Sequence, residues 1–206
     1  MTTFKIFQLE KNNEDIRKTV LTNVIKMFTE RNLLKYDDMD KNIKKILSIH
    51  SDDHTYIIDI DGKDGSQKCT IKMFNQKITA ISKQSPISDF LIKFKDSQKV
   101  IIVKNISTKA RQYVVNNYPK TEIFLESYLM INLVDNVLVP KYEILSRDYD
   151  NFKTFFEQYQ CKKRKVPKML MNDSVSLYYN LKRDDIVRII RPSETSGYSA
   201  FYRLVI

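Results

Sequence analysis

The chain contains few of the residue types on which common functional sites depend. Its 206 residues include 3 glycines, 2 cysteines and no tryptophan. So few glycines leave no glycine-rich loop for phosphate binding. The two cysteines, Cys69 and Cys161, are far apart and form no CxxC motif. We therefore expect neither a disulfide framework nor a cysteine zinc site, and a reducing compartment fits.

Long apolar runs are also missing. No segment approaches the ~20 consecutive apolar residues of a membrane-spanning helix. Residues 1–15 mix charged residues among apolar ones, which is not the pattern of a secretion signal. No Ser/His/Asp or Cys/His spacing points to nucleophilic catalysis. We expect a soluble protein, and the sequence indicates neither a cofactor nor a bound metal.

Positive charge is what the chain has in excess. The 35 Lys and Arg residues outnumber the 25 Asp and Glu residues, which gives a formal net charge of +10. Such a surplus favours polyanionic partners such as nucleic acid. From Pro140 onward there are 13 basic and 8 acidic residues, against 22 and 17 before it, so the positive charge is denser in the C-terminal third. The alternative is a basic protein with no such partner.

Two modules are expected, with the boundary at Pro140, because proline fixes its own backbone and pushes the preceding residue toward extended geometry. The first module, residues 1–139, alternates helical and strand patterns, which is typical of an α/β domain. Its predicted elements are an amphipathic helix at 15–34, a hairpin of strands at 55–60 and 67–74, a buried strand at 99–104, and a helix that ends before Pro119.

The end of the strand at 99–104 and the start of the helix after it form a candidate phosphate-binding site. Ser107 or Thr108 can cap this helix. A helix N-terminus presents unpaired backbone N–H groups and a partial positive charge, and Lys104, Lys109 and Arg111 add cations around it. An ordinary capped surface helix with solvated lysines is the alternative.

The second module, residues 140–206, is predicted to be a small α+β unit. Ser146 can cap a helix from about 148 to 160, and Asp173 can cap a shorter helix. The basic segment 161–166 between them is a nuclear import signal, a nucleic-acid patch or a solvated loop. Strands are expected at 185–192 and 199–206. Because the chain ends in an apolar strand, we expect a free strand edge that invites pairing with another chain.

Three stretches of the C-terminal third carry a resemblance to a known family. They are LVPKYEILS (138–146), LKRDDIVRIIRPSETSG (181–197) and FYRLVI (201–206). In length and order they resemble the assembly domain of the fifth common subunit of eukaryotic DNA-directed RNA polymerases, whose archaeal counterpart is that domain alone. The resemblance implies a non-catalytic subunit of a multisubunit polymerase. It also implies an N-terminal α/β jaw domain, restriction-nuclease-like but without an active site, and a C-terminal assembly domain.

The resemblance also implies where the partners bind. The jaw approaches downstream double-stranded DNA, and the matching loop is filled by Asn105, Ile106, Ser107, Thr108 and Lys109. With the cations beside that loop, the candidate DNA-binding residues are Lys104, Ser107, Thr108, Lys109 and Arg111. The assembly domain packs against the largest polymerase subunit. The interface positions carried over are Pro140, Lys141, Pro167, Lys168, Lys182, Arg183, Arg188, Arg191, Pro192, Ser193, Glu194, Thr195, Tyr202 and Arg203. Intramolecular pairing with Glu194, Asp184 or Asp185 is the alternative role of the arginines.

Several positions depart from the family pattern. Asp184 and Asn180 replace glycines, and Tyr198 replaces an arginine. Asparagine enters left-handed backbone geometry comparatively easily, so Asn180 is tolerable. The divergence and the abundance of Lys, Asn, Ile and Tyr favour a copy carried by a large DNA virus, with a divergent AT-rich eukaryote as the alternative source. We then expect the host cytoplasm and the virion as its location, with the nucleus as the alternative.

A metal-dependent nuclease is the main competing function. Asp59, Asp61 and Lys63 nominally match the carboxylate-and-lysine pattern of such enzymes. Gly62 and Gly65 make this segment a turn, where Asp and Lys are common for backbone reasons. Turn chemistry is the better account.

A histidine pair and a free DNA-binding protein are the remaining possibilities. His50 and His54 are four residues apart, a spacing that could bind zinc on a helix, but no further ligand pattern stands nearby. The last possibility is a free basic DNA-binding protein that never joins a polymerase. This function would use the positive charge of the chain but would not need an assembly domain.

Overall fold

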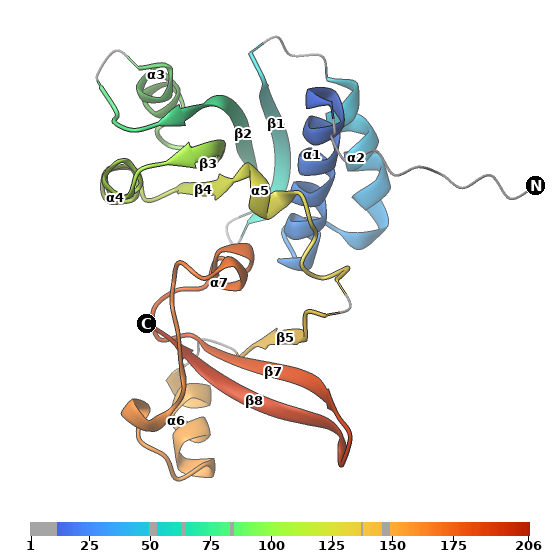
Figure 1. The fold of residues 1–206 in the computed structure, drawn as a ribbon, viewed down its shortest axis with the longest axis vertical. Coiled ribbons are helices and arrows are strands. Elements are labelled where there is room, and N and C mark those ends of the chain that lie inside the picture. Colours follow the sequence, from blue (N-terminus) through green and yellow to red (C-terminus); the bar gives the residue numbers. More distant parts are fainter. Residues whose placement is uncertain (1–11, 50–52, 63–64, 83–84, 137, 146–148) are drawn as a thin grey trace, which may run out of the picture. The chain divides into compact units, whose positions relative to one another are not determined.

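The computed structural model describes residues 12–49, 53–62, 65–82, 85–136, 138–145 and 149–206. The chain divides into two compact units, Met1–Ile131 and Asn132–Ile206, each with its own sheet (Figure 1). Both units mix helices and strands, so the broad α/β prediction is confirmed. No helix among the described residues is both long and apolar enough to cross a membrane.

The N-terminal unit is built on a four-stranded sheet in the order β1-β2-β3-β4. The strands β1 (Thr55–Gly62) and β2 (Gly65–Ile78) form the predicted antiparallel hairpin. The strands β3 (Gln98–Ile106) and β4 (Thr121–Leu125) run parallel to β2. The carboxyl ends of β2, β3 and β4 therefore share one edge of the sheet.

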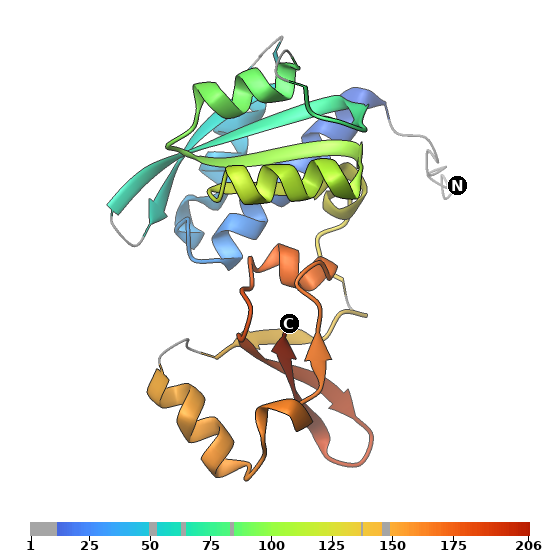
Figure 2. The same ribbon diagram turned by 90° about the vertical axis from the view of Figure 1, so that its left-hand side faces the viewer.

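Helices cover both faces of this sheet. On one face, α3 (Pro86–Lys93) and α4 (Thr108–Asn117) pack on Ile101 and Val103 of β3 (Figures 1 and 2). Side chains alternate along a strand, so Val100 and Ile102 are directed to the opposite face. That face carries α1 (Asn13–Glu30), the 3₁₀ turn Tyr36–Asp38, α2 (Met39–Ser48) and α5 (Glu126–Leu129).

The opening helix is confirmed, but it ends at Glu30 and not at residue 34. Leu33 lies in the turn that follows, where its carbonyl accepts a hydrogen bond from the Asp61 backbone N–H at 2.8 Å. The sequence patterns did not predict α2, α3, β4 or α5. Of these, α3 begins with a strong signal, because Ser85 caps the helix and Pro86 stands at its first position.

The C-terminal unit contains a second sheet, in the order β5-β7-β8-β6. Its strands are β5 (Lys141–Ile144), β6 (Lys168–Met169), β7 (Ile186–Ser193) and β8 (Gly197–Val205), and its helices are α6 (Tyr149–Gln158), the 3₁₀ turn Lys163–Lys165 and α7 (Ser174–Tyr178). Asp173 caps α7 as predicted, accepting a hydrogen bond from the Val175 N–H at 2.9 Å. The predicted cap Ser146 lies outside the described residues.

Both faces of the second sheet are covered. Val187 and Val205 belong to a cluster with Val175 of α7, whereas Ile186 and Leu204 belong to a cluster with Phe155 of α6. The alternation along β7 and β8 thus divides the apolar residues between two cores.

The prediction of a free strand edge at the C-terminus is wrong for the last residues. The strand β8 lies inside the sheet, and Leu204 and Val205 pair with β6. The Ile206 N–H also donates to the Met169 carbonyl at 2.9 Å. Because β6 is only two residues long, residues 197–203 have no strand partner on that side within the described part of the chain.

Candidate nucleic-acid and subunit interfaces

The junction between β3 and α4 is tightly fixed. Ser107, and not Thr108, caps α4: its Oγ accepts a hydrogen bond from the Ala110 N–H at 3.1 Å. The same hydroxyl donates to the Thr79 carbonyl at 2.6 Å, and the Ser107 N–H donates to the Ile78 carbonyl at 2.9 Å. These bonds hold the start of α4 at the carboxyl edge of the parallel strands, where helix N-termini commonly meet anions.

The predicted cations stand on the two segments that meet at this junction. Lys104 and Lys109 are exposed, at the end of β3 and in the first turn of α4. Arg111 is half-buried, and this burial lowers the pKa of its guanidinium, which still stays charged at neutral pH. Lys77 was not predicted. It joins the group because β2 pairs with β3 in a register that places Lys77 opposite Asn105.

The predicted nuclease residues do not form a metal-binding site in the described part of the chain. The carboxylate of Asp59 is more than half exposed, and its Oδ2 lies 4.0 Å from the Nζ of Lys45. Asp61 pairs with Ser66 at the end of the hairpin. No group of three or more His, Cys, Asp or Glu side chains among the described residues could hold a metal. Lys63 and His50 lie outside the described residues.

The predicted interface residues of the C-terminal unit lie on several of its elements. Lys141 and Arg188 stand on the neighbouring strands β5 and β7 and both approach Glu143, at 3.2 and 3.5 Å. Glu143 is a partner that the sequence did not indicate for Arg188. The guanidinium carbon of Arg191 lies 3.7 Å from the centre of the Phe201 ring, which is stacking contact.

The remaining interface positions are also near or on the surface. The Tyr202 hydroxyl is 2.9 Å from that of Tyr159. Lys168 is tied down through its Nζ, which donates to the Lys163 carbonyl at 2.6 Å. Those left are half-buried or exposed: Pro140, Pro167, Lys182, Arg183, Pro192, Ser193, Glu194, Thr195 and Arg203.

Two residues that replace family glycines adopt left-handed backbone geometry. The φ angles are 49° at Asn180 and 73° at Asp184. These two positions therefore have the backbone geometry that glycine adopts easily, although their side chains differ from the family's glycines. Each residue finds a local partner: Asn180 Oδ1 accepts from Lys182 Nζ at 2.7 Å, and Asp184 Oδ1 lies 2.7 Å from Lys163 Nζ.

Comparison with known proteins agrees with this geometry. The family model described as RNA polymerase Rpb5, C-terminal domain, matches residues 131–205. DNA-directed RNA polymerase subunit 5 of Acanthamoeba polyphaga mimivirus is 33% identical, over 98% of this chain and 97% of its own length. The chain belongs to the RNA polymerase subunit 5 family. The predicted resemblance is thus confirmed.

Eukaryotic members of the subunit 5 family are also similar. The rpabc1 subunit of RNA polymerases I, II and III from Dictyostelium discoideum is 26% identical over 79% of this chain and 94% of its own length. RPABC1 of Caenorhabditis elegans is 34% identical, over 53% of each chain. As a subunit 5 protein, the chain is a non-catalytic component of a multisubunit RNA polymerase, and its partners are other polymerase subunits.

Proposed function

We propose that the C-terminal unit docks this subunit 5 protein on the largest polymerase subunit, and that the N-terminal unit is a jaw that contacts downstream duplex DNA. The jaw would share the fold of restriction-type nucleases without their active site. The mimivirus relative comes from a large DNA virus, which supports a viral polymerase that works in the host cytoplasm and is packaged in the virion.

The observation that carries the DNA contact is the fixed start of α4, with four cations on the segments that meet there. The cations Lys77, Lys104, Lys109 and Arg111 stand near the carboxyl ends of β2 and β3 and in the first turn of α4, and the Ser107 cap fixes the helix N-terminus there. Cations and backbone N–H groups of this kind bind phosphate oxygens without reading the base sequence. A jaw that slides along the template needs contact of this nonspecific kind.

Docking is supported by the surface of the C-terminal unit. Residues 197–203 of β8 lack a strand partner on one side within the described residues, so another chain could add a strand there. Arg183 and Arg203 are exposed beside this sheet, and arginine suits such an interface because its planar group donates several hydrogen bonds at once.

A reconstitution experiment tests the docking. The full chain is mixed with the purified largest subunit, and co-purification is measured for wild type and for a variant with Lys182, Arg183 and Arg203 changed to Glu. We expect wild type to co-purify and the variant to lose most of the binding. Equal recovery of both proteins would refute the proposed docking residues, and no recovery of wild type would refute docking on that subunit.

The DNA contact is tested in the assembled polymerase. Lys104, Lys109 and Arg111 are changed together to Gln, and the affinity for downstream duplex is measured against salt concentration. Each lost phosphate contact lowers the slope of log K against log salt by about 0.9, so a drop of about 2 to 3 is expected, with little change in sequence preference.

The matched control removes three exposed lysines from around α2, on the other face of the sheet: Lys35, Lys41 and Lys44. This control should leave the slope unchanged. Equal slopes for the α4 variant and wild type would remove the start of α4 from the proposed DNA contact. DNA binding by the free chain that equals binding by the polymerase would favour the alternative of a free DNA-binding protein.

A further inference from the structure

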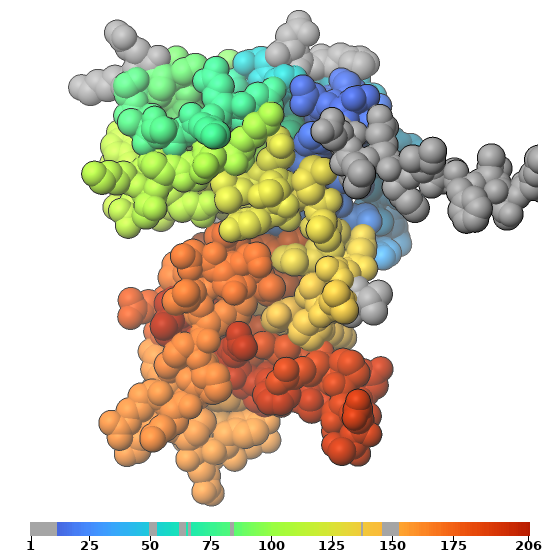
Figure 3. Space-filling model, viewed as in Figure 1, coloured from blue at the N-terminus to red at the C-terminus, as the bar shows by residue number. Residues whose placement is uncertain are grey.

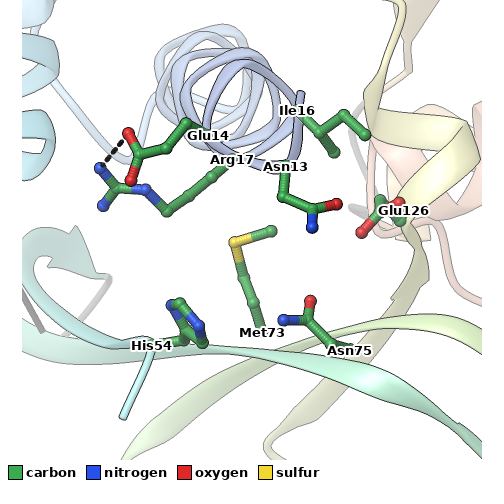
Figure 4. A pocket seen from close by; sticks show the side chains of 8 residues that line it. All are labelled: Asn13, Glu14, Ile16, Arg17, His54, Met73, Asn75 and Glu126. Atoms are coloured by element: carbon green, nitrogen blue, oxygen red, sulfur yellow. Dashed lines mark hydrogen bonds and ion pairs between the residues drawn. The ribbon is translucent and has the colours of Figure 1, made fainter. Parts of the chain in front are cut away.

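A small open pocket in the N-terminal unit belongs neither to the proposed DNA contact nor to the docking surface. Its volume is about 200 Å³, and its walls come from α1, α5, β2 and the residue before β1 (Figure 4). Pockets for whole cofactors or drug-sized ligands are usually about 300 to 1,000 Å³. The space is therefore small for a cofactor and matches a single long side chain better.

The strand pairing leaves room for this pocket. The strand β1 begins at Thr55, which pairs with Lys72 of the antiparallel strand β2. The following residues of β2, which include Met73 and Asn75, therefore have no partner in β1. His54 turns the chain into β1 with a left-handed φ of 48°, and its carbonyl accepts a hydrogen bond from the Met73 N–H at 3.1 Å. The pairing of β2 with β3 is also irregular between Phe74 and Lys77. The pocket lies beside this part of β2, which β1 does not cover.

Arg17 forms one wall of the pocket, but its guanidinium already has partners within the chain. Its Nη1 donates to the buried Tyr56 hydroxyl at 3.0 Å, and its Nη2 lies 3.5 Å from Glu14 Oε2. The hydrogen bond that Arg17 donates to Tyr56 raises the pKa of the Arg17 guanidinium, so the cation is stabilised where it is. Its Nε is fully covered and cannot reach an occupant. Arg17 therefore contributes mainly its stem, and the pocket is not a site for an anion.

The other polar groups are acceptors or can act as acceptors. The side chains of Asn13, Asn75 and Glu126 point toward the same space, and His54 lies on the other side of Met73 (Figure 4). Within the described residues none of these polar groups has a hydrogen-bond or ion-pair partner. Because Glu14 balances Arg17, the carboxylate of Glu126 leaves the pocket with negative charge in a chain of net charge +10.

The walls also have an apolar part. Met73 is buried beneath the pocket, and Ile16 is half-buried at its side. A fitting occupant combines an apolar stem with a cationic head, as lysine and arginine do. Arginine fits better, since its guanidinium presents five N–H donors in one plane to acceptors on several walls, whereas an ammonium presents three.

We propose that this pocket receives an arginine side chain from another subunit of the polymerase, with Glu126 as the ion-pair partner and the amide oxygens of Asn13 and Asn75 as further acceptors. The inference depends on membership in a multisubunit polymerase and not on the proposed DNA contact. The two proposals therefore fail separately.

The chemistry is tested on the free full-length chain by NMR titration with N-acetyl-arginine amide. The probe should shift the signals of residues around Glu126 and Asn75, and the citrulline analogue, which has nearly the same shape and no charge, should not. Glu126→Gln should weaken binding about tenfold, since a hydrogen bond to a charged group is lost. Asn75→Asp adds a carboxylate and should tighten binding several-fold.

The matched control is Glu30→Gln, which removes the same charge from an exposed position at the end of α1. It should change the affinity by less than about twofold. Equal shifts with the arginine and citrulline probes, or equal binding by wild type and Glu126→Gln, would overturn the assignment of the pocket to a cation.

The source of the arginine is tested by labelling carboxylates in the free chain and in the assembled polymerase, with the denatured chain as the reference for full labelling. Glu126 should react in the free chain and be protected at least about tenfold in the polymerase. Equal labelling of Glu126 in both would show that no neighbouring subunit fills the pocket, even if the free chain binds the arginine probe.

Discussion

Removing Arg31 should destabilise the N-terminal unit far more than removing an exposed charge. Arg31 follows α1, and its Nη1 donates to both carboxylate oxygens of Glu122 on β4, at 3.1 and 2.9 Å. The two side chains are only 5% and 15% exposed. Gln98 Nε2 also donates to Glu122 Oε1 at 3.2 Å, and the guanidinium lies over the Phe124 ring. This pair ties the end of the opening helix to the edge of the sheet.

The expected cost follows from this burial. Arg31→Met leaves the Glu122 carboxylate in a covered site with its main cation gone, and such broken pairs cost about 3 to 5 kcal/mol. The double variant Arg31→Met with Glu122→Leu leaves no buried charge behind. It should be more stable than Arg31→Met alone, because replacing both members of a buried pair with apolar residues is often close to neutral.

Hydrogen exchange is the suitable assay, because two units can unfold separately and a single melting curve would mix them. Exchange of backbone amides in residues 98–125 reports the N-terminal sheet. A loss of about 3 kcal/mol corresponds to exchange that is at least about 100-fold faster when opening limits protection. Asp59→Asn, which breaks the exposed contact with Lys45, is the control and should change exchange by less than about threefold.

A cost below about 1 kcal/mol for Arg31→Met would refute the reasoning, since the pair would then contribute no more than an exposed one. A double variant as unstable as the sum of the two single variants would also refute it. That result would mean that the two residues stabilise the unit independently.

Two further predictions concern buried polar groups. Burial raises the pKa of the Cys69 thiol from 9.0 to about 12. Iodoacetamide at pH 8.5 should therefore modify Cys161 and spare Cys69 in the native chain, as peptide mass spectrometry would show. The stability that the neutral Cys69 thiol contributes is present below pH 9 and is lost between pH 9 and 12. Lys99 is fully buried, and its Nζ donates to three carbonyls after α3 at 2.7, 3.0 and 2.9 Å. Lys99→Met should therefore cost at least about 3 kcal/mol by hydrogen exchange of residues 86–106, and the exposed Lys95→Met less than about 0.5; equal effects would refute this role of Lys99.

Local signals allowed much of the fold to be predicted. Asp173 was recognised as a cap, and Ser107 was one of two candidates with Thr108, because a side-chain oxygen before a helix satisfies a free N–H group. This signal requires only neighbouring residues. The hairpin of β1 and β2 was recognised because two apolar strands flank a turn with glycines. Each of these features depends on a few consecutive residues.

Features that depend on pairing between distant segments could not be predicted in the same way. The position of Lys77 beside the α4 junction follows from the register of β2 and β3. Glu143 meets Arg188 only because β5 pairs with β7. The burial of the last residues depends on β6, a strand too short for any periodic pattern. The pocket beside Glu126 has no motif at all, since its walls come from four separate segments.

The shortage of glycine has a consequence for the proposed docking surface. Left-handed geometry costs a residue with a side chain about 1 to 2 kcal/mol, so the positions Asn180 and Asp184 must be held by surrounding bonds. The Asp184 N–H donates to the Val205 carbonyl, and the Val205 N–H donates to the Asp185 carbonyl, both at 2.9 Å.

These bonds join the loop at 180–185 to the end of β8. Asp185 Oδ2 also accepts from the Lys182 N–H at 2.7 Å, which closes the loop on itself. The exposed side chains of Lys182 and Arg183 thus stand on a backbone fixed at both ends. Long basic side chains on a fixed backbone lose less conformational freedom when they bind, which favours docking through this loop.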